Sequence, residues 1–122
     1  VAQVQVDYAT AYHNYRHDLD QFEGTEFDGE GYTKASARFA RFIKNLAQQY
    51  PTDNILIVSH GMALSFGINE LLQTPRMAIR ERGGLSNTST TVLSTTDGQQ
   101  FEIEDWNNTT YLNKLQNDGT TI

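Results

Sequence analysis

Residues 55–66 read ILIVSHGMALSF, and this stretch decides the fold. The four apolar residues from Ile55 to Val58 form a run that is too short for a helix and does not alternate with polar residues. Such runs are typical of a central strand that is covered on both faces, as in parallel α/β sheets. Helical spacing of apolar residues resumes after Gly61. The sequence therefore predicts a buried strand that leads through His60 into a helix.

Helical spacing also predicts two helices upstream of this strand. In residues 1–19, tyrosines supply most of the face with helical spacing, which is therefore only half apolar. The pattern over residues 32–50 is clearer, and Pro51 ends it. The side chains predicted to form its apolar face are Ala35, Phe39, Phe42, Ile43 and Leu46. The acidic, glycine-rich residues 20–31 are expected to form a loop.

A hairpin is predicted downstream. The helix after Gly61 should end before Thr74-Pro75, and residues 76–84 fit either one helical turn or a loop. The runs STTVLST (89–95) and QFEIEDW (100–106) flank an Asp97-Gly98 pair, which favours a turn between two strands. The polar tail is expected to fray beyond Leu112.

The composition is that of a globular protein. Of the 122 residues, 38% are hydrophobic and 20% are charged. The net charge of −6 and the lack of a basic run argue against nucleic acid or an anionic membrane as partner. There is no cysteine, so disulfides and thiolate chemistry are excluded, and the cytoplasm is the default location. No apolar run is long enough to cross a bilayer.

His60 is predicted where ligands bind in open α/β sheets, between the carboxyl end of a strand and a helix. The helix N-terminus offers unpaired N–H groups and a partial positive charge, which suit a phosphate. Gly61 fits this picture, because a tight turn beside a ligand favours a residue without a Cβ. The imidazole can bind a phosphoryl oxygen, act as nucleophile or transfer a proton. It can equally be an ordinary polar residue in a turn, and the residues alone leave both readings open.

Four motifs occur in a fixed order: FDGEGYTKASARFARFIKNLAQQYP (27–51), LIVSHG (56–61), LSNTSTTVL (85–93) and WNNTTYL (106–112). Together they resemble the histidine phosphatase superfamily, the phosphoglycerate mutase-like proteins, and LIVSHG is similar to its second histidine motif. The resemblance covers about residues 25–112. It implies an α/β fold of three layers (α/β/α), of which this chain holds the C-terminal part: helices, a buried central strand and a β-hairpin.

The resemblance implies phosphoryl transfer through a phosphohistidine, with no metal or cofactor. His60 matches the second histidine, so it is expected to be catalytic and, with Gly61 and Met62, to bind phosphate. Glu30 aligns with a family glutamate and is expected to support the phosphate pocket. The implied substrate is a small phosphorylated metabolite. A phosphatase is favoured over a mutase, because the long insertions of the metabolic mutases are missing.

The family's nucleophilic histidine lies in an Arg-His-Gly motif that this sequence lacks. Arg16-His17 is followed by Asp18 and falls in a helical pattern, so we reject it as the nucleophile. We therefore expect residues 1–122 to be a single-domain fragment, inactive alone. We expect it to pair with the missing N-terminal half or to self-associate, because an uncovered apolar strand edge recruits other chains. The alternative is a non-catalytic phosphate-binding or scaffold domain of the same fold.

Three other groups of residues are candidate binding sites. His13 and His17 have the spacing of metal ligands on one helix face, but no third ligand is evident, which favours two solvated histidines. The acidic residues of 23–30 do not match the spacing of an EF-hand, so a solvated loop is favoured over a calcium site. The three arginines of residues 76–82 can reach an anionic substrate, although solvated loop arginines are more common.

Overall fold

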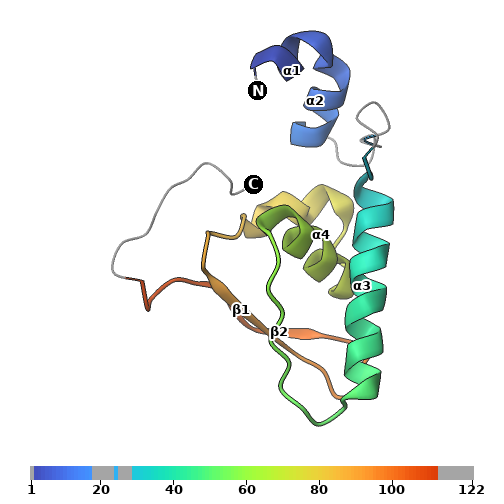
Figure 1. The fold of residues 1–122 in the computed structure, drawn as a ribbon, viewed down its shortest axis with the longest axis vertical. Coiled ribbons are helices and arrows are strands. Elements are labelled where there is room, and N and C mark those ends of the chain that lie inside the picture. Colours follow the sequence, from blue (N-terminus) through green and yellow to red (C-terminus); the bar gives the residue numbers. More distant parts are fainter. Residues whose placement is uncertain (1, 18–23, 25–28, 113–122) are drawn as a thin grey trace.

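The computed structural model describes residues 2–17, 24 and 29–112, and in this part helices pack beside a two-stranded antiparallel sheet (Figure 1). The predicted α/β class is confirmed. The elements are α1 (Ala2–Asp7), α2 (Ala9–His17), α3 (Tyr32–Gln49), α4 (Gly61–Leu71), the 3-10 helix η3 (Arg76–Arg82), β1 (Thr90–Ser94) and β2 (Glu102–Asn108). No helix of the described residues is long and apolar enough to cross a membrane.

The core of the molecule lies where α3 packs against α4. The sequence predicted both of these helices. One cluster of the core lies between their N-terminal halves and η3 and contains Tyr32, Phe66 and Ile79. The Tyr32 and Phe66 rings meet edge to face, with centroids 4.9 Å apart. A second cluster contains Ala40, Ile43 and Leu71.

The hairpin of β1 and β2 is confirmed. Its strands pair antiparallel, with Leu93 opposite Ile103, and Leu93 also packs against the second core cluster. The carboxylate of Asp97 accepts hydrogen bonds from the backbone N–H groups of Gln99 and Gln100, both at 2.8 Å. Gly98 has a φ of +73°, a conformation that favours glycine because other side chains are strained there. The Asp-Gly pair therefore builds the turn as its sequence indicated.

The N-terminal helical prediction is confirmed in type but not in continuity. The helix breaks at Tyr8, whose carbonyl accepts the first hydrogen bond of α2 from the N–H of Tyr12 at 2.8 Å. Of the expected tyrosine face, Tyr8 is exposed and Tyr15 packs against the first core cluster. Ala11, which the predicted face did not include, is buried.

The prediction that residues 55–59 form a buried central strand is wrong. The segment is irregular, and Leu56 and Val58 expose 88% and 87% of their surfaces. A strand is stabilised by ladder hydrogen bonds and by cover on its apolar faces. In the described part of the chain β1 and β2 pair only with each other, so this segment has neither a ladder nor cover on its outer side.

The predicted core face of α3 is wrong at Phe42. The helix turns Tyr32, Ser36, Ala40 and Ile43 inward, while Phe42 is exposed. The inward face holds smaller side chains than predicted because α4 lies close against it. Much of the expected acidic loop, including Glu23, Glu26 and Asp28, lies outside the described residues, as do Asp18, Leu19 and the tail beyond Leu112.

Gly67 is the residue of α4 that allows this close approach. A Cβ built at Gly67 would lie 1.9 Å from Cδ1 of Phe39. We predict that Gly67→Ala destabilises the protein by about 1–3 kcal/mol through overpacking, although Ala exceeds Gly in helix propensity by about 1 kcal/mol. Urea unfolding measures the change.

Gly29→Ala serves as the control, because its Cβ would meet only the Gly24 carbonyl oxygen at 3.5 Å. The double variant Gly67→Ala/Phe39→Ala should recover part of the loss relative to the sum of the single variants. Unchanged or increased stability of Gly67→Ala would contradict the close packing.

Asp97 makes a pH-dependent contribution to the hairpin. Hydrogen bonds from the backbone N–H groups of Gln100 and Gln99 hold the pKa of its carboxyl below the usual value. A lowered folded-state pKa contributes stability that is fully present above the unfolded pKa of about 3.9 and is lost as pH falls through the folded value. We predict that Asp97→Asn lowers the urea midpoint at pH 7 and that this difference shrinks below about pH 4. A difference that is the same at pH 7 and pH 3 would contradict the assignment.

Candidate functional site

His60 is the N-cap residue of α4, the place that the sequence predicted. Its backbone is extended, with φ −120° and ψ 158°, and its carbonyl oxygen accepts a hydrogen bond from the N–H of Leu64 at 2.9 Å. The imidazole makes no capping hydrogen bond within the described residues and is exposed. N-cap side chains usually accept a bond from the first turn, and here that function is not used. The ring is therefore free to approach a ligand.

The first turn of α4 adds backbone donors beside this imidazole. The N–H groups at the start of a helix have no acceptor within the helix, and those of Gly61 and Met62 lie in this turn. The helix dipole adds a partial positive charge. The side chain of Met62 packs against the first core cluster, so only its backbone is available to an anion. The φ of Gly61 is not positive, so the backbone conformation itself does not require glycine.

Glu30, the expected supporting residue, is occupied by an ion pair. Its carboxylate accepts hydrogen bonds from Nε of Arg38 at 3.1 Å and from Nη2 at 2.5 Å. The hydrogen bond from Arg38 lowers the pKa of Glu30, and the charge of Lys34 acts in the same direction. Sequence spacing did not identify Arg38, because the pair joins the segment before α3 to the second turn of that helix. Among the described residues, the Glu30 side chain makes no hydrogen bond or ion pair with His60.

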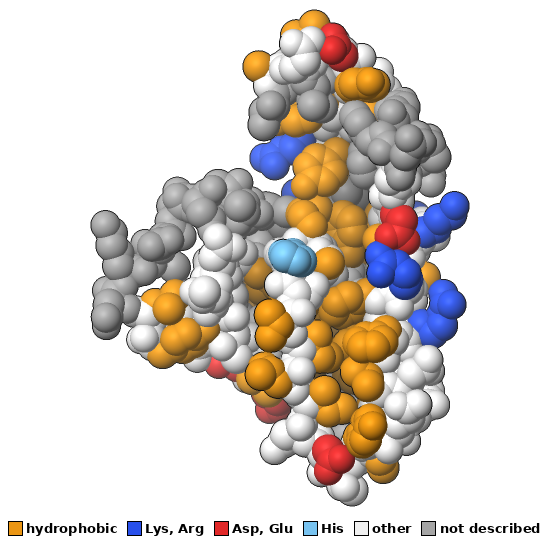
Figure 2. Space-filling view, in the orientation of Figure 1, with side chains coloured by type: hydrophobic (Ala, Val, Ile, Leu, Met, Phe, Trp, Pro, Cys, Tyr) orange, Lys and Arg blue, Asp and Glu red, His pale blue; other side chains and the backbone are white. Residues whose placement is uncertain are grey.

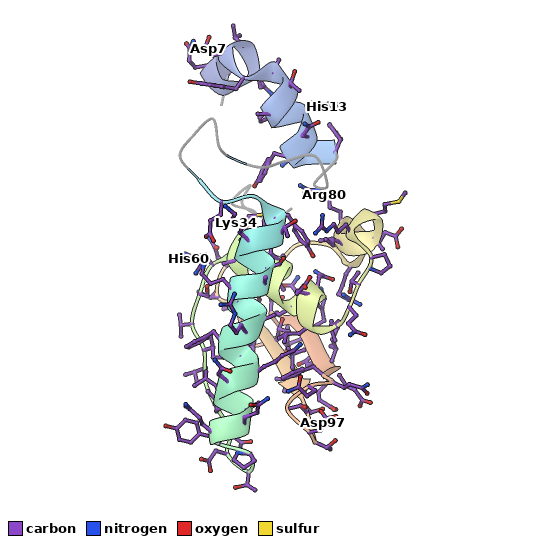
Figure 3. All side chains as sticks on the ribbon, turned by 90° about the vertical axis from the view of Figure 1, so that its right-hand side faces the viewer. Asp7, His13, Lys34, His60, Arg80 and Asp97 are labelled. Carbon is purple, nitrogen blue, oxygen red and sulfur yellow. The ribbon has the colours of Figure 1, made fainter. Side chains whose placement is uncertain are left out.

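Two cationic side chains lie on the N-terminal part of α3. Lys34 and His60 are at the same level along α3 in the side view of Figure 3, and α4 begins at that level in Figure 1. Lys34 and Arg38 are exposed, and Figure 2 shows blue side chains to one side of the pale blue histidine. This end of the molecule therefore combines an imidazole, a helix N-terminus and the Lys34 ammonium, all open to solvent, while the charge of Arg38 is paired with Glu30.

The arginines of η3 bind other elements of the fold. Arg76 donates to Oγ1 of Thr33 at 2.7 Å and lies over the Tyr32 ring at 5.1 Å. Arg80 donates to the carbonyl of Tyr15, and burial lowers its pKa. The expectation of solvated arginines is thus wrong for Arg80, which is partly buried, whereas Arg76 is exposed as expected although it also bonds to α3.

Arg82 makes the corresponding tie to α4. Its Nη1 donates to Oδ1 of the buried Asn69 at 2.7 Å, and the guanidinium lies 5.5 Å from the centroid of the Trp106 ring. The Nδ2 of Asn69 in turn donates to the carbonyl of Ser65 at 2.7 Å. Both functional groups of a buried amide are thereby satisfied.

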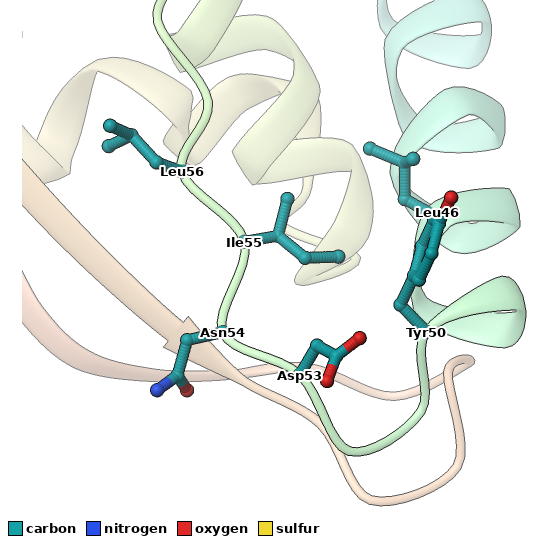
Figure 4. Close-up of a pocket in the computed structure, with 6 residues that line it drawn as sticks. All are labelled: Leu46, Tyr50, Asp53, Asn54, Ile55 and Leu56. Atoms are coloured by element: carbon teal, nitrogen blue, oxygen red, sulfur yellow. The ribbon is translucent and has the colours of Figure 1, made fainter.

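The remaining candidates lie on other elements. His13 and His17 share one face of α2, with ring centroids 5.0 Å apart. Across the described residues no three metal-ligating side chains come together. Two shallow hollows, of about 420 and 360 Å³, are lined by residues other than His60, and Figure 4 shows the larger one.

Comparison with known families gives one result. The chain matches the model of the histidine phosphatase superfamily (branch 1) over residues 1–109. No curated protein and no solved structure matches it.

The Arg82–Asn69 contact generates a test of the structural role of η3. We predict that Arg82→Ala destabilises the protein by about 1–3 kcal/mol, because the buried oxygen of Asn69 loses its donor. The neighbouring exposed Glu81→Ala is the control and should change stability little. Urea unfolding measures both variants, and equal midpoints for the two would contradict the contact.

Proposed function

The chain belongs to the histidine phosphatase superfamily, and from this premise we propose that it contributes His60 to a phosphoryl-transfer site for small phosphate esters. The reaction proposed for the intact protein is hydrolysis through a phosphohistidine. One observation carries the proposal: the exposed imidazole of His60 is not used as a helix cap and stands beside the free N–H groups that begin α4.

The proposed role of His60 is to stabilise the charge of the transferred phosphoryl group. In the first step a nucleophilic nitrogen attacks phosphorus, the bond from phosphorus to the ester oxygen breaks, and an acid protonates the leaving oxygen. In the second step water attacks the phosphohistidine and releases inorganic phosphate. His60 donates an N–H to a phosphoryl oxygen in both steps, and the N–H groups of Gly61 and Met62 add fixed dipoles.

The nucleophile is proposed to come from polypeptide other than these 122 residues. The chain contains three histidines, and the two besides His60 are His13 and His17 on α2. His13 is labelled in Figure 3 on the helix at the far end from the sheet, away from His60. This arrangement supports the inference that the chain alone does not turn over phosphate esters.

The family membership also supports a second candidate, a phosphate-binding or scaffold domain without catalysis. The Glu30–Arg38 pair is the observation in its favour, because it engages the carboxylate that was expected to support the pocket. The two candidates share phosphate binding at His60 and differ in turnover.

The test begins with phosphate binding by the chain. Inorganic phosphate is titrated into the chain and followed by NMR, and we predict that the amide signals of Gly61 and Met62 shift. His60→Ala should remove these shifts, while the control variant His13→Ala, on α2, should keep them. If His60→Ala and the unaltered chain respond alike, the site lies elsewhere.

Turnover distinguishes the two candidates. With p-nitrophenyl phosphate, the 122-residue chain should show no hydrolysis above buffer. In the intact protein His60→Ala should lower kcat by about 10²–10⁴-fold, the usual cost of removing a group that stabilises or protonates the transition state. Phosphate binding by an intact protein that never hydrolyses the ester would favour the non-catalytic candidate.

A further inference from the structure

His13 and His17 of α2 form a pair that the proposed phosphoryl transfer does not use. They are four residues apart, so their side chains lie one above the other on one face of the helix. Both are exposed, and their ring centroids lie 5.0 Å apart with the ring planes inclined by 45°. Among the described residues neither imidazole makes a hydrogen bond or an ion pair. The ring nitrogens are therefore available to a ligand.

The separation of the two rings fits the coordination of one metal ion. Histidine nitrogens bind zinc at about 2.0–2.1 Å. With roughly 1.2 Å from a nitrogen to its ring centre, each centroid lies about 3.2 Å from the ion. Two such ligands at the tetrahedral angle then have centroids about 5 Å apart. The observed 5.0 Å agrees, so one ion can bind both rings once a nitrogen of each turns toward it.

The face of α2 that carries the pair is its polar, outer side. Ala11 and Tyr15, which face inward, are each two residues from His13 and so lie on nearly the opposite side of the helix. Arg16 is exposed between the two histidines. Imidazoles and a guanidinium are suited to contact with water, so the exposure of this face does not depend on which other polypeptide completes the core.

We propose that His13 and His17 together bind a divalent transition-metal ion such as Zn²⁺ or Cu²⁺, with water at the remaining positions. Imidazole nitrogen suits these ions, whereas Mg²⁺ and Ca²⁺ prefer oxygen ligands. The described residues add no third ligand to the pair, and the charge of Arg16 disfavours a cation. The ion is therefore bound weakly and exchanges with solvent. This site does not depend on the proposed phosphoryl transfer.

The bound ion favours the helical form of α2. The helix has 9 residues, fewer than the roughly 12–15 that an isolated helix needs in water. The two histidines are held at chelating distance only while the turn between them is helical. The ion therefore binds the folded helix more tightly than an unfolded segment, and by mass action it stabilises the folded form.

The first experiment is a calorimetric titration of the 122-residue chain with Zn²⁺ and with Cu²⁺ at about pH 7.5, because metals bind the neutral form of imidazole. We expect one ion per chain, with Cu²⁺ bound more tightly than Zn²⁺. His13→Gln and His17→Gln should each raise the dissociation constant about tenfold or more, since even the loss of an outer partner of a metal ligand costs about 10–100-fold. The control His60→Gln replaces the remaining histidine of the chain and should leave the affinity unchanged.

The second experiment compares amide hydrogen exchange with and without Zn²⁺. The ion should slow exchange in residues 9–17 and not in α4, and His17→Gln should abolish this protection. The proposal is overturned if neither ion binds, or if only one of His13 and His17 affects the affinity, because a single imidazole does not chelate. Equal losses of affinity in His17→Gln and His60→Gln also overturn it. Bound Zn²⁺ that leaves exchange in α2 unchanged overturns the stabilisation of the helix.

Discussion

The close contact between Gly67 and the ring of Phe39 sets the distance between α3 and α4, and the rest of the molecule depends on that distance. With a hydrogen in place of a side chain, α4 comes near enough to α3 for the Tyr32–Phe66 pair to close on one side. On the other side the same approach brings Leu71 onto Ala40. A wider spacing would leave voids in both core clusters, since protein interiors are close-packed. The start of α4, and with it His60, is positioned by this packing.

Local sequence signals predicted the elements that depend on local interactions. The spacing of apolar residues and Pro51 bounded α3 correctly, and Asp97-Gly98 identified the hairpin through the turn it forms. The strand prediction at 55–59 failed for a different reason. Apolar residues such as those at 55–58 form a central strand only when a neighbouring strand pairs with them and other elements cover both faces. The described residues provide neither the neighbouring strand nor the full cover. Nonlocal pairing cannot be read from the segment itself.

In the candidate site, too, the features set by local sequence were predictable and those set by tertiary packing were not. The position of His60 before a helix was predictable, because it follows from the strand-like run and the apolar spacing on either side. The roles of Arg80 and Arg82 were not, because their partners Tyr15 and Asn69 are set by tertiary packing. The family was recognised from several short motifs in order, and the match over residues 1–109 bears this out. A single motif such as LIVSHG would not have sufficed, since short patterns recur in unrelated folds.

The exposed segment before His60 also governs how the molecule meets proteases. Proteases bind their substrates as extended chains, and residues 54–59 lie outside any helix or strand, with mostly exposed side chains. Cleavage there requires no prior unfolding, so its rate follows access to the backbone and not the free energy of unfolding. A cut within this segment would separate α3 from α4 in the sequence while their packed faces stay in contact. The lifetime of the chain thus depends on whatever shields these few peptide bonds.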